Sequence, residues 1–234
     1  MKTVFRKEMI QYKVTPIGAV FLAAFWAFTG YYFTINILLS ARSDISSFFQ
    51  NVFSLLMILI PLLTMRIYSE EKRQGTDQLL LTSPISIWSI VFGKFLATFC
   101  IFLLGSLSVI PGLIILYSFN SLDTLMTIGN LFALILIGMA FISIGILAST
   151  LTENQIVAAV LTYVLLLGLW SLDYLKAFIG NTILLHIISY VSFRSHFSIL
   201  GSGVFPLATF VYFLSLTVLM LLLSCMAISH RRVG

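Results

Sequence analysis

Long apolar runs separated by short polar segments dominate this chain. A helix needs about 20 apolar residues to cross a bilayer, and the first uncharged run already extends from Ile17 to Ala41. The runs that we expect to span a membrane are residues 17–41, 48–65, 95–119 (with a kink at Pro111), 124–147, 155–176 and 205–228. The pattern predicts an all-α integral membrane protein with six transmembrane helices in a single transmembrane domain, residues 1–234.

The composition supports this prediction and narrows the possible functions. Of the 234 residues, 60% are apolar and only 9% are charged, whereas soluble domains are about 45–50% apolar and about 25% charged. These values exclude a soluble enzyme, a disordered chain and a disulfide scaffold. Cys100 and Cys225 both fall inside apolar runs, without the spacing of a metal site, so we expect neither a disulfide nor a bound metal.

The distribution of Lys and Arg predicts the orientation of the spans. With six spans, ten of the 13 Lys and Arg residues lie on the side of the two termini and three lie on the other. Basic residues concentrate on the cytoplasmic side of a membrane, so both termini are expected in the cytoplasm of a multi-pass cell-membrane protein. Arg194 and His196 then face outwards. The moderately apolar residues 181–203 would form a re-entrant or surface-lying pair of helices on the outer side.

The first 15 residues predict an amphipathic helix that lies on the membrane surface. One face of this helix carries Met1, Val4, Phe5, Met9 and Tyr12. The other face carries Lys2, Arg6 and Lys13. The alternative is a solvated tail.

The centres of the predicted spans carry no ionisable residue, which argues against a carrier coupled to protons or sodium. Passage of an apolar or amphipathic molecule, powered from elsewhere, fits this pattern, as does a passive scaffold. Gly93-Lys94 resembles the end of a phosphate-binding loop, but Trp88 and Phe95 occupy positions that the loop needs for Gly and Ser or Thr. An intramembrane serine protease would use Ser202 with His186 or His196, yet Gly-Ser-Gly is typical of a turn, and both histidines lie in the same outer segment as the serine.

Residues 69–83 form the most polar segment between the predicted spans. A cluster of four charges, Glu70 to Arg73, precedes Gly75, which suits a left-handed helix end. Thr76 can cap a short helix with an apolar side, residues 79–81, and Ser83-Pro84 can start the next helix. This arrangement predicts a docking element for a soluble partner, with a loop on the lipid surface as the alternative.

Several motifs in this order resemble those of ABC type 2 exporter permeases. The resemblance in the coupling region rests on Glu71-x-x-x-Gly75-Thr76, Leu79-Leu80, Ser83-Pro84 and Phe92-Gly93-Lys94. The segment from Thr15 to Phe33, and Gly145 to Thr150 followed by Glu153 and Ala158, resemble the gliding-motility-type branch of the family. Together these motifs cover nearly the whole chain.

The resemblance implies the permease subunit of an ATP-driven exporter that moves an amphipathic or apolar substrate, such as a peptide, lipid or drug, outwards. It implies a dimer with a second permease copy or homologue and two cytosolic ABC ATPase subunits, which bind ATP and Mg; this chain would bind no cofactor, metal or nucleic acid. The ATPase-coupling residues would be Glu70, Glu71, Arg73, Gly75, Thr76, Leu79 and Leu80. The second and fifth spans would line the substrate pathway, with Asn51, Phe53, Thr162 and Tyr163 as candidates. The alternatives are an ABC permease that serves assembly of an envelope machine, a non-transport membrane scaffold, or an intramembrane protease.

Overall fold

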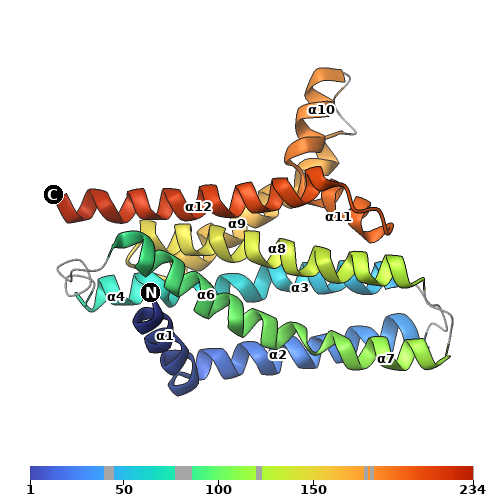
Figure 1. Cartoon of the computed structure of the whole chain (residues 1–234), viewed down its shortest axis with the longest axis horizontal. Coiled ribbons are helices and arrows are strands. Elements are labelled where there is room, and N and C mark those ends of the chain that lie inside the picture. The colour runs from blue at the N-terminus through green and yellow to red at the C-terminus, as the bar shows by residue number, and fades with distance from the viewer. Residues whose placement is uncertain (40–44, 77–85, 120–122, 177–178, 180–181, 234) are drawn as a thin grey trace.

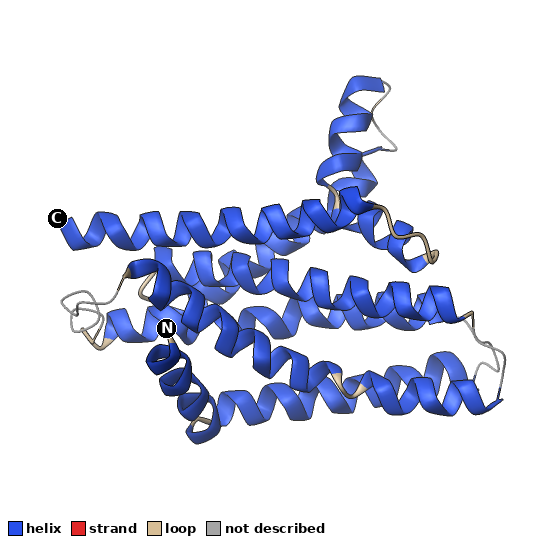
Figure 2. Cartoon of the chain, viewed as in Figure 1, coloured by secondary structure: helices blue, strands red, loops and turns tan. Residues whose placement is uncertain are grey.

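The computed structural model describes residues 1–39, 45–76, 86–119, 123–176, 179 and 182–233. In this part of the chain the secondary structure is helical and no strand occurs (Figure 2). Six helical segments are long and apolar enough to cross a membrane. The predicted class, an all-α integral membrane protein with six spans, is confirmed.

The helices follow one another along the chain with short connections. Their bounds are α1 Lys2–Val14, α2 Pro16–Phe33, the π-helix η1 Thr34–Leu39, α3 Ile45–Thr64, α4 Arg66–Arg73, α6 Ile87–Ser106, α7 Val109–Phe119, α8 Thr124–Leu151, α9 Gln155–Leu175, α10 Thr182–Val191, α11 Phe193–Gly201 and α12 Leu207–Val233.

Helices α3 and α8 form the centre of the bundle. About 67% and 72% of their most apolar windows are buried, compared with 22–28% for the other four spans. Small residues let α8 approach its neighbours: a Cβ at Gly138 would lie 2.3 Å from the ring of Phe102 on α6. The remaining spans surround this pair and leave their apolar outer faces to lipid.

The two ends of the bundle differ in what they carry. Both termini lie at the end where α4 finishes, and α10 and α11 lie at the opposite end, with α10 projecting from the bundle (Figure 1). Helix α1 lies against α6 and α2 at the first of these ends. The chain therefore crosses the bundle six times and returns to the side where it began.

The third span breaks before its proline rather than at it. Helix α6 ends at Ser106 and α7 begins at Val109, so Pro111 lies in the first turn of α7. A proline has no N–H, and its ring clashes with the carbonyl four residues earlier, here Leu107. The first turn of a new helix tolerates both features, which is why the break falls at residues 107–108.

Helix α1 forms as its sequence predicts, and part of its apolar face lies against α6. Val4 is 4% exposed, and a Cβ at Gly93 would lie 3.2 Å from the Val4 side chain, whereas Met1 on the same predicted face is 51% exposed. The basic residues Lys2, Arg6 and Lys13 are exposed. The helical wheel predicts the two faces, but only the tertiary structure shows which part of the apolar face meets α6.

Candidate functional site

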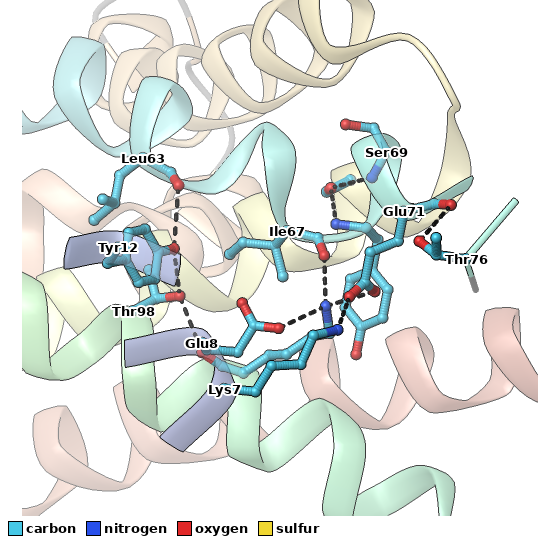
Figure 3. Close-up of polar contacts among 12 residues, drawn as sticks. Lys7, Glu8, Tyr12, Leu63, Ile67, Ser69, Glu71, Thr76 and Thr98 are labelled. Atoms are coloured by element: carbon cyan, nitrogen blue, oxygen red, sulfur yellow. Dashed lines mark hydrogen bonds and ion pairs between the residues drawn. The ribbon is translucent and has the colours of Figure 1, made fainter. Parts of the chain in front are cut away.

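A buried lysine lies where α1, α4 and α6 meet. Lys94 on α6 is 1% exposed, and its Nζ lies 2.7 Å from Glu71 Oε2 on α4 and 3.1 Å from Glu8 Oε1 on α1 (Figure 3). It also donates to the carbonyl of Ile67 at 2.7 Å and lies 4.5 Å from the centre of the Tyr68 ring. An ammonium group has three N–H donors. The Ile67 carbonyl and Glu71 Oε2 accept hydrogen bonds from Lys94, and Glu8 Oε1 lies beside the same ammonium group as an ion pair.

The charges around Lys94 balance. Lys7 Nζ lies 2.9 Å from the second oxygen of Glu71, so two lysines face two glutamates, and we call these four residues the Lys94 cluster. The side chains of Glu8 and Glu71 are 6% and 8% exposed, whereas Lys7 is 53% exposed and carries the cluster to the surface. Charges this deeply buried persist only when they are paired and hydrogen-bonded. The cluster therefore holds its three helices in one arrangement.

The register of α1 brings Glu8 into the cluster. Val4, Glu8 and Tyr12 are spaced by four residues and share the face that meets α6. The Tyr12 hydroxyl lies 3.1 Å from Thr98 Oγ1 on α6 and 3.4 Å from the carbonyl of Leu63 on α3. Burial raises the pKa of Tyr12 well above its ordinary value, so this hydroxyl keeps its proton. It is a second polar link between α1 and the spans, one turn beyond Glu8.

Helix α4 ends in a Schellman motif. Gly75 has a φ of +67°, which confirms the left-handed conformation predicted for it. The N–H of Thr76 donates to the carbonyl of Glu71, and the N–H of Gly75 donates to the carbonyl of Lys72, both at 3.0 Å. The chain therefore turns sharply away from α4 four residues after Glu71.

The structure divides the predicted coupling residues into two groups. Arg73, Gly75 and Thr76 are exposed at the end of α4. Glu70 and Glu71 are buried: Glu70 pairs with Arg66 one turn earlier, and Glu71 belongs to the Lys94 cluster. In this structure both carboxylates are thus paired with cations of the same chain, and their contact with a partner protein stays a prediction. Leu79 and Leu80 lie outside the described residues.

The predicted pathway residues also fall on different faces. Phe53 is fully buried against Phe197, with ring centres 4.4 Å apart, and Thr162 is fully buried and donates to the carbonyl of Ala158 in its own helix. Asn51 is half-buried, and Tyr163 is 38% exposed. Because α3 is apolar almost throughout, its sequence did not indicate which of its faces is exposed on the bundle surface. The residues of α3 that are exposed on the bundle surface are Ser54, Ile58 and Leu62.

The sequence analysis missed Lys94 and Glu8 as site residues. Two signals could have found them. Glu8 interrupts the apolar stripe between Val4 and Tyr12, and Lys94 stands between Phe92 and Phe95 in an otherwise apolar run. Ionisable residues at such positions need a partner of opposite charge. Which residue supplies that partner depends on the helix packing.

The described residues form neither a metal site nor a pairing of His196 with Ser202. Within the described residues, no group of three His, Cys, Asp or Glu side chains could hold a metal ion. His196 bonds to the carbonyl of Tyr190 at 3.0 Å and lies 3.2 Å from Thr209 Oγ1, whereas Ser202 Oγ donates to the carbonyl of Ile199. His196 and Ser202 are thus bonded to other groups and not to each other, and the side chain of His186 lies outside the described residues.

Comparison with known proteins identifies one family. The family model described as ABC-2 family transporter protein matches residues 35–231. A search of curated protein sequences finds no match. The matched region contains Glu71 and Lys94, whereas Lys7 and Glu8 precede it. The cluster thus joins the matched helices to the N-terminal helix.

Proposed function

Because this chain belongs to the ABC-2 transporter family, we propose that it is the permease subunit of an exporter driven by ATP hydrolysis on a separate subunit. Members of this family are membrane permeases without an ATPase site of their own. In the proposed complex, two permeases, identical or related, stand beside two cytosolic ATPase subunits. Both termini and the end of α4 face the cytoplasm, and the substrate is amphipathic or apolar.

The Lys94 cluster is the observation that carries this proposal. It joins α4 to α6 and α1 beside the point where the chain leaves α4 for residues 77–85. A buried set of ion pairs resists separation because an unpaired buried charge is costly. A partner that moves the end of α4 would therefore move α6 and α1 with it. Motion reaches the spans as a rigid-body shift between two packed states, each favoured by different contacts.

Among the described residues, Arg73, Gly75 and Thr76 are the predicted coupling residues that are exposed to an ATPase, and Leu79 and Leu80 stay part of the proposed docking element. Arg73 is exposed at the end of α4, and a guanidinium group forms strong charge-assisted bonds with carboxylates. Gly75 supports the contact by setting the direction of the turn. Glu70 and Glu71 contribute indirectly in this proposal, because their ion pairs with Arg66 and Lys94 hold α4 in place.

The substrate pathway is proposed along the exposed stripe of α3 and the exposed side of α9. Ser54, Ile58 and Leu62 follow one another at spacings of four on α3, and Tyr163 is exposed on α9. A mostly apolar stripe with one hydroxyl suits an amphipathic substrate. Phe53 and Thr162 would support this surface from behind instead of lining it.

The proposal is tested by purifying the tagged full chain from its native membranes in a mild detergent. We expect an ABC ATPase subunit and ATP hydrolysis to copurify with the wild type. Arg73→Glu should reduce both, because it places a repelling charge on the docking surface. Lys13→Glu is the matched control, since Lys13 is also exposed but lies on α1. A wild-type chain that is recovered intact without ATPase or hydrolysis would contradict the proposal.

A further inference from the structure

The junction between α3 and α4 has an unusual hydrogen-bond arrangement. Helix α3 ends at Thr64 and α4 begins at Arg66, with Met65 between them. The N–H groups of Tyr68 and Ser69, in the first turn of α4, donate to Ser149 Oγ at 3.0 and 3.1 Å. The Ser149 hydroxyl in turn donates to the carbonyl of Met65 at 3.2 Å. Ser149 belongs to α8 and is fully buried.

Ser149 therefore acts as an N-cap that comes from another helix. The first N–H groups of a helix have no carbonyl partner within that helix, and a side chain of the preceding residue usually accepts from them. The preceding residue here, Met65, cannot do so. A serine hydroxyl has one proton and two acceptor sites, and Ser149 uses all three on this junction.

Further contacts hold both sides of this junction on α8. One turn before Ser149, Gly145 lets α8 approach the end of α3: a Cβ there would lie 2.2 Å from Thr64 Oγ1. One residue after Ser149, the carbonyl of Thr150 accepts a bond from Lys72 Nζ. Helix α4 is thus bonded to α8 on one side, while Glu71 reaches Lys94 on the other.

We propose that Ser149 is a positioning residue that sets the angle of α4 relative to α3 and passes the motion of α4 to α8. The first part rests on the hydrogen bonds alone, and the second part rests on the proposed function. Without the hydroxyl, two buried N–H groups lose their acceptor, and such groups are costly to leave unpaired. The nearest replacement acceptors are the carbonyls of Thr64 and Met65, four residues earlier in a continuous helix. Taking them would straighten the junction and turn α4.

The same helix offers a matched control. Ser143 is also fully buried on α8, but its hydroxyl donates to the carbonyl of Ala140 in its own helix. Replacing either serine by alanine removes one buried oxygen from α8. Only the change at Ser149 removes bonds to α4. A difference between the two variants therefore reports on the position of α4 and not on general loss of packing.

The experiment measures the distance between spin labels on the full-length chain in lipid nanodiscs, without any ATPase. The labels are placed by Gln74→Cys at the end of α4 and Ile156→Cys at the start of α9, two exposed positions, after Cys100 and Cys225 have been replaced. We expect Ser149→Ala to shift the distance distribution and Ser143→Ala to leave it unchanged. Ser149→Thr, which keeps the hydroxyl, should restore the wild-type distance.

The positioning role is overturned if Ser149→Ala leaves the distance unchanged, or if Ser143→Ala shifts it equally. If too little Ser149→Ala protein folds, Gly145→Ala provides a second variant, because it pushes α8 away from Thr64 while Ser149 is retained. It should also shift the distance, and an unchanged distance would count against the proposal.

A second measurement addresses the transmission of motion. In the complex with the ATPase, Ser149→Ala should change ATP hydrolysis about two- to thirtyfold, the range for residues that carry coupling. A shifted distance with unchanged hydrolysis would overturn the transmission through α8. If the wild type binds no ATPase, the proposed function fails, and a shifted distance would still support the positioning role.

Discussion

Paired charges occur at both ends of the helix bundle, but they are built differently. At the end with the termini, the Lys94 cluster joins residues from α1, α4 and α6, and the side chains of Glu8, Glu71 and Lys94 are 1–8% exposed. At the opposite end, Asp173 pairs with Lys176 three residues later, and these side chains are 16% and 28% exposed. Ser195 on α11 donates to Asp173 at 2.8 Å.

The two kinds of ion pair stabilise different things: one fixes how helices pack together, and the other stabilises a single helical turn. A pair within one helical turn, close to water, stabilises its own turn and gains little from the charge attraction. A buried pair between helices far apart in sequence ties the positions of those helices together, because neither charge can be left alone. We therefore expect substitutions in the Lys94 cluster to lower the free energy of unfolding more than substitutions at the opposite end.

The largest effect is expected for Lys94→Met, which leaves Glu8 and Glu71 buried without their shared cation. Breaking a buried pair by removing one partner typically costs about 3–5 kcal/mol. Thermal unfolding of the purified chain in detergent should show a correspondingly large loss of stability. In the triple variant with Glu8→Gln and Glu71→Gln, no buried charge remains unpaired, so much of the loss should be recovered. A single variant as stable as the wild type would contradict the role of the cluster.

A smaller effect is expected for Glu71→Gln. This change removes the charge that faces Lys7 and Lys94, but Lys94 keeps Glu8 and the carbonyl of Ile67. Hydrogen bonds to charged groups contribute about 1.5–3 kcal/mol each, and the amide can still accept one. Chemical denaturation should therefore place this variant between Lys94→Met and the wild type. The ranking would be wrong if Glu71→Gln destabilised the chain more than Lys94→Met.

Gly75→Val tests the turn that follows α4. Nothing lies within 4 Å of a Cβ at this position, so its effect comes from the positive φ alone. A left-handed conformation costs a residue with a side chain about 1–2 kcal/mol, and a β-branched residue adopts it least readily. Hydrogen exchange at the end of α4 should become faster. Gly168→Val is the control, because Gly168 also has open space but lies in an ordinary helix; equal effects would contradict the strain argument.

The smallest effect is expected for Asp173→Asn at the opposite end. The amide can still accept the bond from Ser195, and only the local pair with Lys176 is weakened. Exposed ion pairs contribute about 0–1 kcal/mol, and added salt should reduce the difference further. The midpoint of thermal unfolding should stay close to that of the wild type. A loss as large as that of Lys94→Met would remove the contrast between the two ends.

The predicted coupling residues show which features a sequence pattern can predict: local helix ends, but not contacts between distant helices. The charge cluster before Gly75, and the glycine itself, predict where α4 ends and how the chain turns there, because a helix end depends on neighbouring residues. The partner of Glu70, Arg66, lies one helical turn away, within reach of the same local reasoning. The partners of Glu71 were not predictable in this way, because Lys94 and Lys7 are 23 and 64 residues away from it. Phe53 and Ser54 make the same point: an apolar span does not reveal which of two neighbours faces its core.

By itself, the sequence determined the class of the protein, its six spans and the end of α4 at Gly75. Apolar length decides whether a helix can enter a bilayer, and a helix end depends on residues close in sequence. The caps Ser86, Asp123 and Asn154, which the sequence analysis did not predict, likewise act on N–H groups only two or three residues away. Only the tertiary structure decided that Glu8 meets Lys94, that Ser149 caps α4, and that Val4 on α1 packs against α6. Those contacts depend on the rotation and close approach of helices distant in sequence, which residue periodicity does not specify.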